Sequence, residues 1–213
     1  MSRFRWKIAQ YAEIRWWQNY LKSKPANDYL WSKSNYWTDF LRKINISPEP
    51  GSTALDAGSG PAGIFIILKD LLVDAVDPLI NHYQEKLEHF KKEKYPFVSF
   101  FPISLEDFVP EKTYDTAFCI NVINHVRDLE NCLDKLDSCL GSAGKLVISI
   151  DTHNYQFFKY LFRTIQVDIL HPHQYDLADY RSMFERRGFE ILDEVRCEKR
   201  FLFDYYVLVC RKN

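Results

Sequence analysis

Two histidines spaced by two, His171 and His173, flank Pro172 in the stretch DILHPHQYD. Imidazole exchanges a proton near neutral pH, and it is also a common metal ligand. Because proline disfavours the helical conformation in the residue before it, the segment is expected to be extended. Three interpretations stay open: acid–base work or contact with a substrate, a metal site completed by a third ligand, and a loop whose histidines bond only within it.

A second pair with the same spacing, Asp151 and His153, follows the apolar run KLVIS. Residues two apart point to the same side of an extended chain, so both side chains can reach one ligand at the end of a strand. Either could also be the third ligand of a metal held by His171 and His173. Asp151 has a competing interpretation as the cap of a following helix. We predict that these four residues serve the chemistry of a substrate, and we predict no metal.

The elements that must position these residues fall into two parts, separated by Pro48, Pro50 and Gly51. Before this break, helical spacing of apolar residues predicts helices over 4–24 and 28–46. After it, short β-rich runs alternate with helical stretches, which predicts a parallel sheet with crossover helices. The strands are expected at 52–57, 73–77, 97–103, 114–121 and 145–151, and the helices at 63–72, 79–94, 128–140, 155–165 and 177–187.

The last part of the chain carries its own signals. Asp176 is placed to cap the helix 177–187, Asp179 puts an acid in its first turn, and Gly188 is placed to end it in a left-handed conformation. Two strands, 189–198 and 201–212, follow with little between them. We therefore expect them to pair as an antiparallel hairpin.

Composition limits the classes of partner. Lys and Arg total 28 against 29 acidic residues, and this balance argues against a protein that binds nucleic acid or an anionic membrane. The N-terminus lacks the apolar core of a signal peptide, and no apolar run is long enough to span a bilayer. The five cysteines have no paired spacing, which favours buried, reduced thiols. We expect a cytoplasmic protein, as a monomer or homodimer.

A glycine-rich turn, in ALDAGSGPAGI, follows the first predicted strand. Gly58 and Gly60 allow the backbone to turn sharply and to approach a ligand closely. Asp77 ends the second predicted strand about 20 residues later, where a carboxylate can accept both hydroxyls of a ribose. Asp56 precedes Gly58 by two positions, which is unusual for dinucleotide-binding turns. The alternative to a ligand site is a tight strand–helix turn that binds nothing.

From about Thr53 to its end, the chain resembles the class I S-adenosylmethionine-dependent methyltransferases, a seven-stranded Rossmann-like family. The family's first motif, an acid followed by x-G-x-G, corresponds to Asp56, Gly58 and Gly60, and Gly63 stands one position late. The resemblance implies an α/β fold with a mostly parallel seven-stranded sheet, an antiparallel strand in the C-terminal hairpin, and S-adenosylmethionine as cofactor.

The resemblance also implies roles for individual residues. Gly58 and Gly60 would pass close to the methionine portion, Asp77 would hold the ribose, and Asn121 would line the methionine side. Ser104 stands where the family often has an acid that binds the adenine amine, which is a departure from the pattern. The implied cofactor site within the resemblance comprises Asp56, Gly58, Gly60, Asp77, Pro78, Ser104, Leu105, Glu106 and Asn121.

Residues 1–50 lie before the methyltransferase-like part, 51–213, and we expect them to form a helical lid. Most of their aromatic side chains are expected to pack against the domain. Tyr11 and Trp16 are predicted to face the cofactor.

The sequence as a whole predicts a methyltransferase that transfers a methyl group to an oxygen or nitrogen atom of a small molecule. A nicotinamide-dependent oxidoreductase is the first alternative, although Asp56 and the terminal hairpin argue against it. A non-catalytic protein that binds S-adenosylmethionine is the second.

Overall fold

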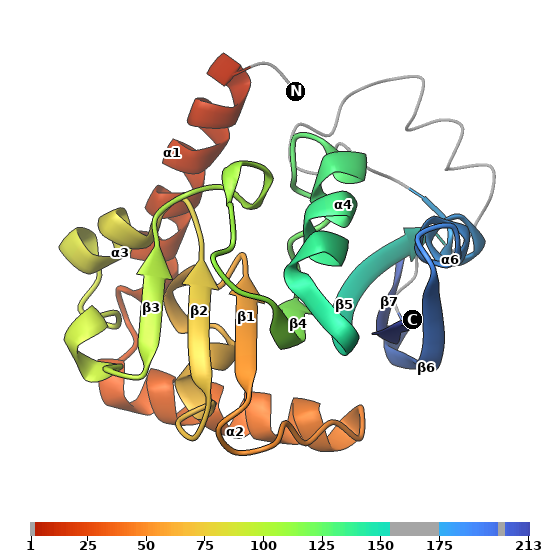
Figure 1. The fold of residues 1–213 in the computed structure, drawn as a ribbon. Helices are drawn as coiled ribbons and strands as arrows, with labels where there is room; N and C mark the ends of the chain where they lie inside the picture. Colours follow the sequence, from red (N-terminus) through yellow and green to blue (C-terminus); the bar gives the residue numbers. More distant parts are fainter. Residues whose placement is uncertain (1–2, 154–174, 200–202) are drawn as a thin grey trace. The chain divides into compact units, whose positions relative to one another are not determined.

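The computed structural model describes residues 3–153, 175–199 and 203–213 (Figure 1). The chain forms two compact units, Met1–Phe108 and Val109–Asn213. The first unit contains the N-terminal helices and three strands, and the second contains four strands. The predicted division at residue 50 stays a prediction, but the helices before it pack within the first unit.

Three parallel strands form the centre of the first unit: β1 (Thr53–Ala57), β2 (Leu72–Val76) and β3 (Val98–Phe101). Ala57 pairs with Val76, and Val76 pairs with Phe101, so the three strands end at the same level. Parallel sheets are normally covered on both faces, and four of the five residues of β1 and of β2 are accordingly buried, among them Asp56 and Asp74. This alignment places whatever follows each strand at one edge of the sheet.

The helix predicted over 63–72 does not form. Two short 3-10 helices stand in its place, η1 (Gly60–Ala62) and η2 (Ile64–Ile67), and that prediction was wrong. Gly63 between them is extended, with ψ −176°. A Cβ on Gly63 would lie 2.4 Å from both Asp56 Oδ2 and Ser59 O, so the chain here is pressed against the end of β1. Such packing leaves no room for the turns of a regular helix.

Helices α1 (Arg3–Leu21) and α2 (Ala26–Lys43) confirm the two predicted N-terminal helices. The face of α1 that packs inward holds Ile14 and Leu21, both 2% exposed, whereas Tyr11, Trp16 and Tyr20 are exposed. These three side chains of α1 are therefore exceptions to the expectation that most aromatic side chains of residues 1–50 pack against the domain. Helix α2 buries Tyr29, Trp37 and Phe40, and its Trp37 Nε1 donates to Ala62 O at 3.0 Å. This bond fixes α2 against the turns that follow β1.

Helix α3 (Ile80–Lys86) is shorter than the predicted helix over 79–94, and a 3-10 turn, η3 (Lys92–Lys94), comes after it. Leu87 and Phe90 continue the buried helical spacing of Ile80 and Tyr83, which explains the longer prediction, whereas the buried His89 lies off that face. A further 3-10 turn, η4 (Leu105–Asp107), follows β3 and completes the described elements of the first unit.

The second unit is built on β4 (Tyr114–Cys119), β5 (Leu140–His153), β6 (Phe189–Lys199) and β7 (Phe203–Lys212). Strand β4 runs parallel to β5, and β7 runs antiparallel to both β5 and β6. The strand order is β3-β2-β1-β4-β5-β7-β6. The predicted fold class, a Rossmann-like, mostly parallel seven-stranded sheet with an antiparallel C-terminal hairpin, is confirmed.

Side chains cap both of the described helices of the second unit. The Asp128 carboxylate accepts from Asn131 N at 3.1 Å at the start of α4 (Leu129–Cys139). Asp176 caps α6 (Leu177–Glu185) as predicted, and together with Asp179 it forms a capping box, which was not predicted. Gly188 after the helix has φ +80°. The helix predicted over 155–165 lies outside the described residues.

The described helices include none with the length and apolarity needed to cross a membrane. Four of the five cysteines are buried, and Cys197 is half-buried. The predicted burial of most thiols is confirmed, and their reduced state stays a prediction.

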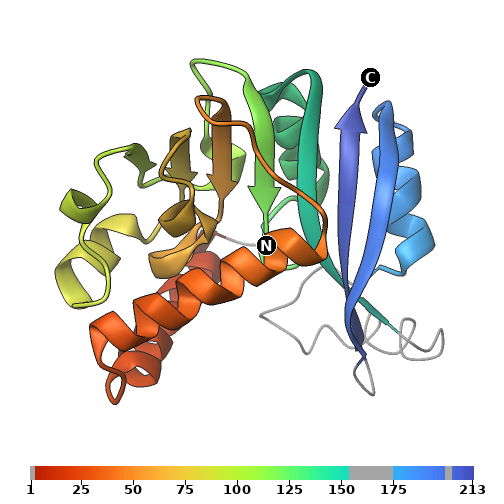
Figure 2. The ribbon, with the colours of Figure 1, turned by 90° about the horizontal axis from the view of Figure 1, so that it is seen from below.

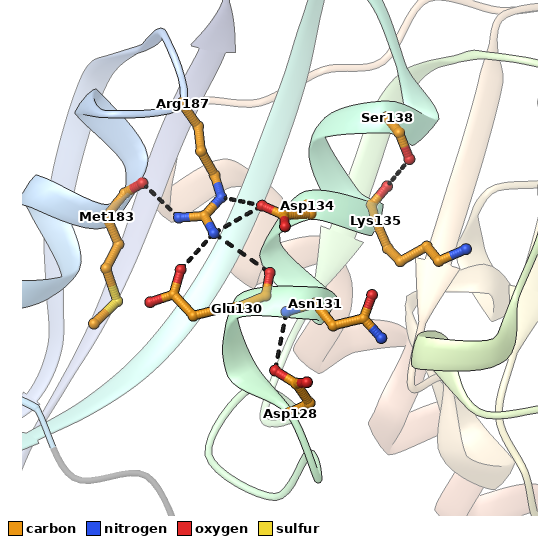
Figure 3. Close-up of polar contacts among 8 residues, drawn as sticks. All are labelled: Asp128, Glu130, Asn131, Asp134, Lys135, Ser138, Met183 and Arg187. Atoms are coloured by element: carbon orange, nitrogen blue, oxygen red, sulfur yellow. Dashed lines mark hydrogen bonds and ion pairs between the residues drawn. The ribbon is translucent and has the colours of Figure 1, made fainter.

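Arg187 joins α6 to α4 (Figure 3). Its guanidinium lies 2.5 Å from Glu130 Oε2 and 2.8 Å from Asp134 Oδ1, one turn apart on α4. It also donates to Met183 O at 3.0 Å, within α6. The Arg187 side chain is only 14% exposed. Its planar guanidinium group is held in one geometry by hydrogen-bond partners on both helices.

We expect Arg187→Ala to lower the free energy of unfolding by about 1–2 kcal/mol, because one half-buried fork loses several charge-assisted hydrogen bonds, while its carboxylate partners stay solvated. Urea unfolding measures this difference. Arg186→Ala, at the exposed neighbouring position, is the matched control and should change the value by less than about 0.5 kcal/mol. Equal effects of the two substitutions would contradict the role assigned to Arg187.

Candidate functional site

The glycine turn after β1 depends on backbone conformations that favour glycine. Gly58 has φ +72° and Gly60 has φ +58°. The amides of Gly58 and Ser59 both donate to Val76 O, at 2.7 and 3.2 Å, so the turn folds back over the end of β2. The turn is therefore held next to the residue that follows β2, which is Asp77.

The Asp77 carboxylate is the main link between the turn and β2. Its Oδ2 accepts from Gly60 N at 2.9 Å, and its Oδ1 accepts from Leu79 N at 2.8 Å. Asp77 is only 6% exposed. An ionised carboxylate has about four acceptor positions, so these two bonds leave one on each oxygen for the hydroxyls of a ligand.

Asp56, at the other side of the turn, is hydrogen-bonded to the backbone. Its Oδ2 accepts from Phe65 N at 3.0 Å, and the carboxyl fills the space beside Gly63. Its described contacts hold η2 against β1, and its predicted contact with the cofactor stays a prediction.

Burial raises the pKa of both carboxyls. The pKa of Asp56 rises to about 7 because the group is desolvated, although backbone amides partly offset this. The pKa of Asp77 also rises to about 7, through desolvation and then through the nearby negative charge of Glu13. Two buried carboxyls next to a backbone turn cost free energy to keep ionised. Acids whose pKa values are raised in this way are typical of functional sites.

Helix α1 contributes residues to this site that the sequence analysis missed. A Cβ placed on Gly60 would lie 3.9 Å from the Trp17 ring, which also meets the buried Tyr83 edge-on at 6.5 Å. The Tyr83 hydroxyl donates to Glu13 Oε1 at 3.3 Å. Glu13 and Trp17 are four residues apart and so share one face of α1. That spacing was the available signal.

Tyr11 and Trp16, the predicted contacts from α1, are 61% and 54% exposed. The Trp16 ring stacks on Tyr20 at 4.9 Å, and Arg15 lies over the ring of Tyr11. Their contact with the cofactor stays a prediction, whereas Trp17 is the aromatic residue placed on the glycine turn.

The predicted adenine segment lies at η4, after β3. Ser104, Leu105 and Glu106 are all buried. The Ser104 hydroxyl donates to Asp107 Oδ2 at 2.7 Å, so this side chain is used locally. Leu105 is the apolar candidate for contact with a ring. Pro78, half-buried, directly follows Asp77.

In the second unit, Asn121 follows β4 with φ +59°, and its amide donates to Ser149 Oγ at 2.7 Å. Asp151 and His153 belong to the last part of β5, where their backbones pair with Tyr205 and Phe203 of β7.

The histidines that opened the question, His171 and His173, lie outside the described residues. Among the residues that the structure describes, no cluster of three or more His, Cys, Asp or Glu side chains is arranged to hold a metal.

Comparison with known proteins decides the family. Residues 30–194 match the family described as "Methyltransferase domain". The chain belongs to this methyltransferase family. The family predicted from the sequence, the class I S-adenosylmethionine-dependent methyltransferases, is confirmed, and S-adenosylmethionine is the cofactor of that family.

Solved structures share the fold of this methyltransferase. Phosphoethanolamine N-methyltransferase 2 from Haemonchus contortus, in complex with S-adenosyl-L-methionine, has a TM-score of 0.67 and 16% identity over 84% of this chain and 52% of its own. Magnesium protoporphyrin IX methyltransferase from Synechocystis PCC 6803, with bound S-adenosylhomocysteine (SAH), has a TM-score of 0.60 and 19% identity over 87% of this chain and 83% of its own. The N-methyltransferase NodS from Bradyrhizobium japonicum WM9, with SAH, has a TM-score of 0.61 and 12% identity over 90% of both chains. No curated protein matches the chain.

Asp77→Asn tests whether the buried acid carries a raised pKa. A carboxyl whose pKa is about 7 in the folded protein and about 4 when unfolded contributes stability at low pH that is lost as the pH rises through 7. In cofactor-free wild-type protein, we expect the free energy of unfolding to fall between pH 5 and 8. In the variant, this decrease should be smaller by at least about 1 kcal/mol.

Urea unfolding across that pH range measures both slopes. Asp70→Asn, an exposed acid of the same unit, is the control and should keep the wild-type slope. Identical slopes for Asp77→Asn and wild type would show that Asp77 does not titrate in this range.

Proposed function

We propose that this methyltransferase transfers a methyl group from S-adenosylmethionine to an oxygen or nitrogen atom of a small molecule. The observation that carries the proposal is the Asp77 carboxylate, which is buried, bonded to the glycine turn through Gly60 N, and left with an acceptor position on each oxygen. Two free acceptors on one rigid carboxylate suit the two hydroxyls of a ribose.

The other proposed cofactor contacts rest on the resemblance of these segments to the motifs of the family. Gly58 and Gly60 expose backbone without side chains, so the methionine portion can approach there. Leu105 would pack on the adenine, with Ser104 and Glu106 beside it, and Asn121 would line the methionine side. The bound cofactor supplies a methyl group already activated by the positive sulfonium. The protein therefore needs mainly to hold the acceptor atom in line with that methyl group.

Asp151, His153, His171 and His173 are the proposed residues on the acceptor side. An acceptor that arrives protonated needs a base near the transferred methyl group, and imidazole or carboxylate can take that proton. Asp151 and His153 belong to the end of β5, and their spacing by two suits one shared face. His153 and His173 are the first choices for this role.

The near-neutral charge of the chain supports a small-molecule acceptor over nucleic acid, because it offers no general basic excess for phosphates. The neighbours of similar fold differ in acceptor by name, including a phosphoethanolamine N-methyltransferase and a protoporphyrin methyltransferase. We propose that the helices of residues 1–50 help to enclose the acceptor.

Asp77→Ala should weaken the binding of SAH at least tenfold, about 1.4 kcal/mol, because the ribose loses its acceptors. Calorimetric titration measures the affinity, and Asp70→Ala serves as the exposed control. Unchanged affinity would mean that the ribose assignment is wrong. Tight binding of NAD without any response to SAH would instead favour the oxidoreductase alternative.

His153→Ala and His173→Ala should each lower methyl transfer by about 100-fold, the usual size of a lost general base, with SAH affinity intact. Mass spectrometry of a panel of small oxygen and nitrogen acceptors measures turnover. His82→Ala, at an exposed position on α3, is the control.

Normal turnover in both variants would remove these histidines from the acceptor side. SAH binding by the wild-type protein without turnover on any acceptor would favour the non-catalytic alternative.

A further inference from the structure

A hollow of about 400 Å³ lies where α1 meets α2, within the first unit. The tight turn that joins these helices lies at the lower left of Figure 2. In Figure 1, α2 runs below the amino ends of β1, β2 and β3, whereas the glycine turn follows the carboxyl end of β1. The hollow is therefore separate from the site around Asp77, and its size falls in the range of small-molecule sites.

Two half-buried lysines line the hollow. Lys24 Nζ lies 4.5 Å from the centre of the Tyr20 ring, and Lys33 Nζ lies 5.0 Å from that of Tyr36. Within the described residues, neither ammonium group has a carboxylate partner. Burial alone lowers the pKa of Lys33, which means that no described acid offsets its desolvation. An anion in the hollow would supply the missing partner.

Tyr29, on the wall of the hollow, gives an independent sign of a ligand. The residue is only 7% exposed, and its hydroxyl oxygen has no hydrogen-bond partner among the described residues. The ring itself is fixed, because it meets His89 edge-on at 5.5 Å and Tyr20 edge-on at 6.3 Å. A buried hydroxyl left unpaired costs about 1–3 kcal/mol, so such a group is expected to have a partner that the chain itself does not supply.

The start of α2 adds backbone donors at the same place. The first backbone bond there joins Tyr29 N to Pro25 O at 3.0 Å, and Pro25 gives α2 no side-chain cap. The amides of Ala26, Asn27 and Asp28 therefore form the positive end of an 18-residue helix that has no side-chain cap, and of these three residues Asp28 lines the hollow. Asp28, the one acid that lines the hollow, is exposed in this first turn.

We propose that this hollow, defined by Lys24, Tyr29, Lys33 and the start of α2, binds a small molecule through a phosphate group. Lysine ammonium groups and an uncapped helix start are both established ways of holding phosphate. Tyr29 adds a hydroxyl donor, and the Tyr20 and Tyr36 rings offer faces on which the body of the molecule can pack.

Nuclear magnetic resonance of the full chain tests the proposal, with inorganic phosphate titrated at constant ionic strength in the presence of saturating SAH. We expect saturable shifts of the Ala26–Asp28 amides in wild type. Lys24→Gln and Lys33→Gln should each weaken phosphate binding about tenfold, because each removes a charged partner. Lys22→Gln, at an exposed position outside the hollow, should bind phosphate like wild type.

Tyr29→Phe keeps the test independent of folding defects. Because it removes an unpaired hydroxyl, it should not lower the melting temperature without phosphate, yet it should weaken phosphate binding about threefold. The proposal is overturned if wild type shows no saturable shift, if Lys24→Gln and Lys33→Gln bind phosphate as wild type does, or if SAH and phosphate compete.

Discussion

The buried carboxylate of Asp77 is the interaction on which the candidate site depends. It connects the glycine turn after β1 to the first residues after β2, through Gly60 N and Leu79 N. Parallel pairing brings the ends of these strands to one level, and this carboxylate adds a side-chain link to the backbone bonds from Gly58 N and Ser59 N that hold the turn at that edge. The arrangement is costly without a ligand, because burial and Glu13 both work against the ionised form of Asp77.

This cost gives the site a simple logic. Ligand hydroxyls that bond to the free acceptor positions of Asp77 would favour its ionised form, so binding would recover part of the desolvation penalty. Asp56 repeats the pattern on the other side of the turn, where Phe65 N is its partner. Trp17 then closes over Gly60 from α1. Both helices before β1 thus contact the turns that follow this strand, through Trp17 and Trp37.

The sequence predicted the strands, the hairpin and the caps well, because these follow from local alternation and from residues such as Asp176 and Gly188. It failed where packing overrides local pattern. The run 63–72 looks helical, but Gly63 is pressed between Asp56 and the backbone of Ser59. On α1, aromatic residues are so frequent that spacing alone could not tell the buried face from the exposed one. Trp16 was therefore chosen and stays a prediction, whereas Trp17, one position away, is the residue that lies next to Gly60.

The most direct test of this account is a crystal structure of the protein with SAH. The account predicts both ribose hydroxyls within hydrogen-bond distance of the Asp77 carboxylate, with the bond from Gly60 N retained and Trp17 still next to the turn. SAH bound elsewhere, or an Asp77 carboxylate that contacts only the backbone in the complex, would contradict it.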